Sequence, residues 1–90
     1  MDEALGIVEV RGLTAIIEVA DAMLKVANVT LIGYLKVGRS MISVTVRGEV
    51  EAVKVSVELG AETAARAGEL VVAHVIPKPH PQVWNLVVAV

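Results

Sequence analysis

VTLIGYLKVGRSMISVTVR, residues Val29 to Arg47, decides the fold of this 90-residue chain. Val29 to Val37 reads as one strand. Met41 to Arg47 reads as the next, because Ile42, Val44 and Val46 alternate with residues that point the other way, namely Met41, Ser43, Thr45 and Arg47. Gly38 interrupts the apolar run between them, which predicts a β-hairpin with a short loop. The fold then depends on what precedes and follows this hairpin.

Each flank of the hairpin contributes one strand and one helix. Thr14 is predicted to cap or begin the first helix, Gly68 to follow the end of the second, and Pro77 to end the last strand. The order β-α-β-β-α-β predicts an α+β, ferredoxin-like fold with a short C-terminal helix or tail. The flanking elements are strand Ala4–Val10, helix Thr14–Val26, helix Glu49–Ala67 and strand Leu70–Ile76.

The two helices differ in how much of their surface is polar. In the first helix the polar residues form one narrow stripe of Thr14, Glu18, Asp21 and Lys25, so more than one side of this helix must be covered. We expect its own sheet on one side and another subunit on the other, with Met23 in the subunit contact. In the second helix the predicted buried face is Val50, Val53, Val57, Ala61 and Ala64, and the predicted exposed face is Glu51, Lys54, Glu58, Glu62 and Arg66.

Composition also indicates self-association. Hydrophobic residues make up 56% of the chain and the mean hydropathy is +0.71, although so small a domain buries only about 60–65% of the surface of its unfolded chain. The apolar runs are shorter than the ~20 residues of a membrane helix, and no signal-peptide pattern is seen. A net charge of −2 disfavours nucleic acid as a partner, and the lack of cysteine excludes disulfides and thiolate metal sites.

Motifs for catalysis or cofactor binding are not found. The glycines form neither a dinucleotide fingerprint nor a phosphate-binding loop. The acidic residues Glu51, Glu58 and Glu62 are interpreted as a solvated helix face rather than a carboxylate site. His74 and His80 could supply two metal ligands, but no nearby acid completes a familiar set. We therefore expect no enzyme activity, no cofactor and no metal.

Four motifs occur in order along nearly the whole chain: EALG (3–6), ADAMLKVANV (20–29), VRGEVEAVK (46–54) and HVIPKPH (74–80). Their combination resembles the hexamer-forming shell proteins of bacterial microcompartments, the BMC domain family found in carboxysomes and in catabolic compartments. The resemblance implies a single shell domain over residues 1–90, with a core at 3–80 and an apolar tail at 81–90. It also implies a homo-hexamer that packs edge to edge with other hexamers and shell proteins around encapsulated enzymes in the bacterial cytoplasm.

The resemblance also assigns site residues. The loop between the second and third strands would surround a central pore, lined by Val37, Gly38, Arg39 and Ser40. Arg39 would form a ring of guanidinium groups, which do not deprotonate, so small anionic metabolites are the expected cargo of the pore; alternatively, Arg39 folds outward and leaves a backbone-lined hole. Many relatives have glycine at the position of Ser40, so the loop conformation is expected to differ. The contact between hexamers would involve Asp21, Lys25, Asn28, Lys78 and His80.

Two alternatives stay open. The apolar tail Gln82–Val90 is read either as a short helix or strand packed on the subunit through Trp84, or as an exposed patch for a partner. The alternative function is a small ferredoxin-like oligomeric regulator that binds a nucleotide or metabolite between subunits. Such a regulator should have a long loop and a phosphate-binding cluster, whereas this chain has a short loop and no such cluster.

Overall fold

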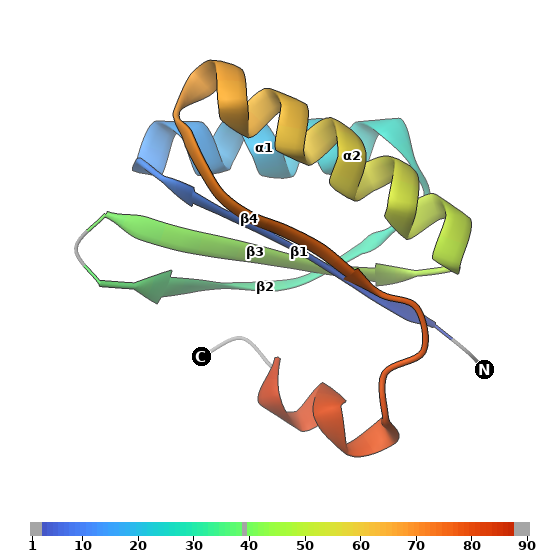
Figure 1. Cartoon of the computed structure of the whole chain (residues 1–90). Helices are drawn as coiled ribbons and strands as arrows, with labels where there is room; N and C mark the ends of the chain where they lie inside the picture. Colours follow the sequence, from blue (N-terminus) through green and yellow to red (C-terminus); the bar gives the residue numbers. More distant parts are fainter. Residues whose placement is uncertain (1–2, 39, 88–90) are drawn as a thin grey trace.

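The computed structural model describes residues 3–38 and 40–87. It consists of a four-stranded antiparallel sheet with both α-helices packed on one face (Figure 1). The predicted ferredoxin-like order is confirmed, and each predicted boundary lies within one residue of the observed one. The elements are β1 Ala4–Arg11, α1 Leu13–Val26, β2 Thr30–Val37, β3 Met41–Gly48, α2 Val50–Ala67, β4 Glu69–Ile76 and a 3₁₀ helix, η1, at Pro81–Leu86.

The strand order in the sheet is β2-β3-β1-β4. The hairpin strands β2 and β3 pair with Val37 opposite Met41, and β1 lies between β3 and β4 with Ile7 opposite Thr45 on one side and His74 on the other. The two central strands are therefore β3 and β1, while β2 and β4 form the edges. Within the described part of the chain, neither α-helix has both the length and the apolarity needed to cross a membrane.

The core lies between the sheet and the two helices. Ile42, Val44 and Val46 of β3 are buried against Val8 and Val10 of β1 and the helices, as the alternation in β3 predicts. The polar residues on the other face of β3 behave differently from a solvated strand face, since Ser43 and Thr45 are also buried. The further core residues are Ala4, Ala15, Ile16, Val19, Met23, Val53, Val57 and Ala64.

Met23 belongs to the core of its own subunit, so its assignment to a subunit contact is wrong. Its side chain is completely buried and fills the space beside Gly60 of α2: a Cβ on Gly60 would stand 2.7 Å from the Met23 sulfur. The narrow polar stripe predicted that much of α1 is covered, but it did not distinguish the side covered by α2 from the side left open. Thr14 lies in the first turn of α1, and Gly12 precedes the helix without a side-chain cap.

The buried face of α2 is also rotated from its predicted position. The observed buried residues are Val53, Ser56, Val57, Gly60, Thr63 and Ala64, while Val50 and Ala61 are only half-buried. The reason is that α2 packs against α1 as well as against β1 and β4. Ser56 faces α1, where its hydroxyl donates a hydrogen bond of 3.1 Å to the Met23 carbonyl. This carbonyl is one of the last four in α1, which lack partners within the helix.

Gly68 ends α2 for a different reason from the one that a helix-terminal glycine usually has. Its N–H donates to the Ala64 carbonyl, but its φ of −163° is ordinary extended backbone. A Cβ on Gly68 would stand 2.7 Å from the Ala15 Cβ and 2.8 Å from the Arg11 carbonyl oxygen. Gly68 is therefore required for close packing at the junction of β1, α1 and β4.

The tail begins with η1, on the face of the sheet opposite the two α-helices (Figure 1). The predicted short C-terminal helix is present, and the His80 Nδ1 accepts a hydrogen bond from the Gln82 N–H at its start (3.1 Å). Trp84 is half-buried, whereas Leu86 is 83% exposed. The two interpretations of the tail each hold in part, because a helix forms and one of its apolar side chains stays open to solvent.

Candidate functional site

The predicted site residues separate to opposite ends of the sheet (Figure 1). At one end lies the β2–β3 loop, since Met41 of β3 pairs with Val37 in β2 and Arg11 in β1. At the other end β3 finishes, where Gly48 pairs with Ala4 at the start of β1. The longest dimension of the subunit is 34 Å. A contact at one end can therefore form without disturbing a site at the other.

The loop of residues 38–40 is held by backbone geometry. Gly38 has a φ of +73°, a conformation that side chains with a Cβ rarely adopt, and it faces open space. The Gly12 N–H donates a 2.8 Å hydrogen bond to the Ser40 carbonyl, which fixes the loop to the β1–α1 junction. Among the described residues only glycines have a positive φ, so Ser40 does not need one. Arg39, the predicted ring of positive charge, lies outside the described residues.

An ion pair at the loop end of the sheet was not found from the sequence. The Arg11 Nε lies 3.2 Å from a carboxylate oxygen of Glu69, and both side chains are exposed. The two residues are 58 positions apart in the chain, so local patterns carry no signal for their contact. Because these charges compensate each other, Glu69 does not add a free negative charge next to the loop. Lys36, at the end of β2, is exposed in the same region.

The residues predicted for the outer edge gather near the end of the sheet that lies far from the loop. Asn28 precedes β2, while Lys78 and His80 follow β4, and all three are exposed. Lys25, one turn after Asp21 on α1, makes a 2.9 Å ion pair with it, and both side chains are largely exposed. Such a surface pair contributes only about 0–1 kcal/mol to stability, so Lys25 can exchange Asp21 for another partner at little cost.

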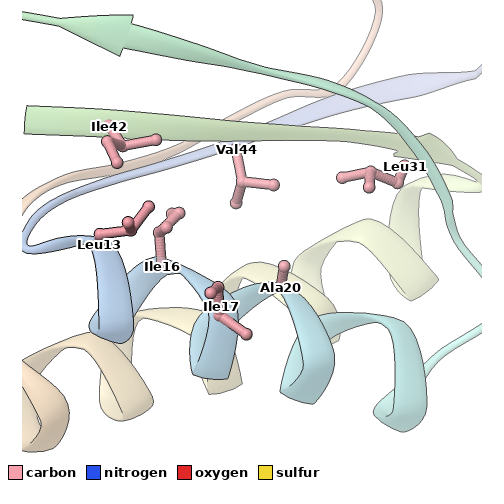
Figure 2. A pocket seen from close by; sticks show the side chains of 7 residues that line it. All are labelled: Leu13, Ile16, Ile17, Ala20, Leu31, Ile42 and Val44. Carbon is pink, nitrogen blue, oxygen red and sulfur yellow. The ribbon is translucent and has the colours of Figure 1, made fainter.

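An open apolar groove of about 230 Å³ runs between α1 and the β2 edge of the sheet (Figure 2). Leu13 and Ile17 of α1, which are 66% and 63% exposed, border it together with Leu31 of β2. Ile42 and Val44 of β3 contribute to its lining. The apolar surplus that the sequence places on the first helix is therefore found at Leu13 and Ile17 rather than at Met23.

Metal and acid–base chemistry have little support in this geometry. In residues 3–38 and 40–87, no three His, Asp or Glu side chains are arranged to hold a metal ion. His74 lies in β4, whereas His80 is engaged by the Gln82 N–H at the start of η1. The features that stand out are instead a tethered loop, an exposed charged end and an uncovered apolar groove.

Comparison with known proteins identifies a family that shares this chain's sequence and fold. The BMC domain model matches residues 4–79. The bacterial microcompartment shell protein PduA of Citrobacter freundii is 56% identical over 84 residues, which is 93% of this chain and 90% of that protein. The carboxysome shell protein CcmK2 of Thermosynechococcus vestitus is 46% identical over 82 residues, 89% of this chain and 80% of that protein.

A solved structure shares the fold. The crystal structure of a microcompartment protein from Desulfitobacterium hafniense superposes with a TM-score of 0.86 at 37% sequence identity. The match covers 97% of this chain but only 47% of the other, so this chain spans about half the length of that protein.

Proposed function

Since the chain belongs to the BMC domain family, we propose that it is one subunit of a cyclic homo-hexamer that packs edge to edge into the shell and carries a central pore. The coarser statement needs no proposal: the chain is a structural shell protein of a bacterial microcompartment, and not an enzyme. The proposal adds the hexamer, the contact between hexamers and the pore. Other shell proteins and the encapsulated enzymes are the further partners that it implies.

The observation that carries this proposal is the separation of the two predicted sites. A ring subunit needs its pore loop at the axis and its tile contacts at the rim. The loop of residues 38–40 and the exposed residues Lys25, Asn28 and Lys78 lie at opposite ends of the sheet. This arrangement supports a subunit whose strands run from the axis toward the rim, with the 34 Å dimension along the radius.

The proposed pore is selective for small anions. With six-fold symmetry the loop brings together six copies of Arg39, and two unit charges at 4 Å repel by about 1 kcal/mol in water and about 4 kcal/mol at an effective dielectric of 20. Glu69, the acid nearest the loop along the sheet, is already paired with Arg11, so bound anions are the remaining source of compensation. Carboxylates, bicarbonate and phosphorylated compounds fit this requirement.

The edge contact is tested by Lys25→Ala. Lysine has a long aliphatic stem that can lie along a neighbouring hexamer while its ammonium donates to backbone carbonyls. We expect the variant to remain hexameric by size-exclusion chromatography with light scattering, and to form no sheets under the electron microscope. Lys54→Ala is the matched control, because Lys54 is an exposed lysine in an ion pair on α2 and should leave the sheets unchanged. Sheets of normal extent from Lys25→Ala would contradict the edge assignment.

The pore is tested by crystals grown in sulfate. An anion on the six-fold axis in the unmodified protein, and none in Arg39→Ala, is the expected result. If Arg39 lies far from the axis and neither crystal holds an anion, the anion-selective pore is wrong while the hexamer stands.

A further inference from the structure

We infer that neighbouring subunits join head to tail, with the apolar groove at the β2 edge of one copy receiving the β4 edge strand of the next copy. The inference rests on the proposed ring and names the two surfaces that form it. The groove is bordered by Leu13, Ile17 and Leu31. The complementary surface is defined by Leu70 and Val72 on β4; we call it the β4 edge.

The two surfaces lie on opposite sides of the subunit. In the strand order β2-β3-β1-β4 the groove belongs to the first edge and the β4 edge to the last. A closed ring with head-to-tail contacts requires two different surfaces of this kind, one for each neighbour. If the groove met the groove of another copy, a two-fold dimer would form instead and no ring would close. The placement of the apolar side chains therefore favours the β4 edge as the occupant.

Both surfaces need a cover. Leu70 and Val72 are 37% and 43% exposed on an eight-residue edge strand that contains neither proline nor lysine, the residues with which proteins commonly protect such edges. The groove leaves Leu13 and Ile17 mostly open to solvent. A second copy of the chain covers both at once, whereas an unrelated partner on either surface leaves the other exposed.

The charges beside the two surfaces are complementary. Lys36 on β2 pairs with Ile42, which is linked through Val10 to Leu70, so Lys36 and Leu70 belong to the same row across the sheet. Glu69 precedes Leu70 at the β4 edge and is exposed. When two subunits stand side by side with their loops toward one axis, these rows meet. The positive end of one edge then approaches the negative end of the next.

Cysteine cross-linking tests this pairing, because the chain has no cysteine of its own. In the double variant Ile17→Cys/Leu70→Cys, a short bismaleimide should link each subunit to the next and give a ladder of covalent oligomers up to the hexamer on a denaturing gel. Each single variant should remain a monomer on the same gel. Val55→Cys/Leu70→Cys is the control, since Val55 is 48% exposed on α2 outside both surfaces, and it should give no ladder.

The outcomes separate this inference from the proposed ring. A hexamer in light scattering with no ladder from the double variant would overturn the pairing and leave the ring intact. A covalent dimer from Ile17→Cys alone would show that grooves face each other, which also overturns it. A monomer in light scattering would refute the ring itself.

A substitution gives a second, independent measurement. Ile17→Glu should shift the protein from hexamer to smaller species, because it puts a charge into the proposed contact, while Val55→Glu should remain hexameric. Both sites are exposed in the single subunit, so the fold should survive and circular dichroism should be unchanged. A hexamer of normal stability from Ile17→Glu would contradict the inference.

Discussion

The contact between Met23 and Gly60 yields a prediction whose sign depends on a second residue. A Cβ on Gly60 would stand 2.7 Å from the Met23 Sδ, 2.8 Å from its Cγ and 3.2 Å from a methyl of Val8. Gly60→Ala therefore forces Met23 to move within a closed core, where it is completely buried. When Met23 is shortened to alanine, the two closest of these atoms are gone and the new methyl group enters the space they leave.

The magnitudes follow from three separate effects. Replacing glycine by alanine inside a helix stabilises it by about 1 kcal/mol, whereas forcing an extra methyl group into a filled core costs about 1–3 kcal/mol. Gly60→Ala alone should therefore lower the free energy of unfolding by about 0–2 kcal/mol. Met23→Ala alone should lower it by about 2–5 kcal/mol, because it creates a cavity. In the Met23→Ala background, Gly60→Ala should instead raise stability by up to about 1 kcal/mol.

The assay is urea unfolding of all four proteins followed by circular dichroism, with the free energies of unfolding extrapolated linearly to water. Assembly stabilises the folded subunit by mass action, so all four are compared at one protein concentration. The interaction energy should be about 1–3 kcal/mol in favour of the double variant. If Gly60→Ala changed the free energy of unfolding equally in both backgrounds, to within about 0.5 kcal/mol, the packing described here would be wrong.

Three further changes test other contacts. Ser56→Ala removes the donor to the buried Met23 carbonyl and should lower the free energy of unfolding by about 1–3 kcal/mol in the same urea assay; no change would mean that this carbonyl has another partner. Gly38→Ala should cost about 1–2 kcal/mol because its φ is +73° and nothing crowds its Cβ, and Gly38→Asn should cost less; equal losses from the two would refute a purely conformational cause. His80→Ala removes the acceptor at the start of η1 and should speed hydrogen exchange at the Gln82 amide without changing the unfolding midpoint by urea. Unchanged exchange at Gln82 would show that this hydrogen bond does not hold η1.

Local patterns in the sequence determine the elements of this fold and their order. Alternation in residues 41–47 and the break at Gly38 identify the hairpin, because the side chains of a strand alternate with period two wherever the strand is packed. Helical periodicity and the glycines and proline at segment ends identify the rest to within one residue. The loop and edge residues were proposed from family motifs, and they lie at opposite ends of the sheet.

Other features depend on which surfaces meet, and a periodic pattern does not contain this information. A helix as apolar as α1 is compatible with several buried faces, and the close approach of α2 at Gly60 selects the one that contains Met23 and leaves Leu13 and Ile17 open. The same approach turns Ser56 inward on α2. Arg11 and Glu69 meet because β1 and β4 are neighbours in the sheet, 58 residues apart in the chain. Packing between elements is set by the shapes of both partners at once, so neither segment read alone specifies it.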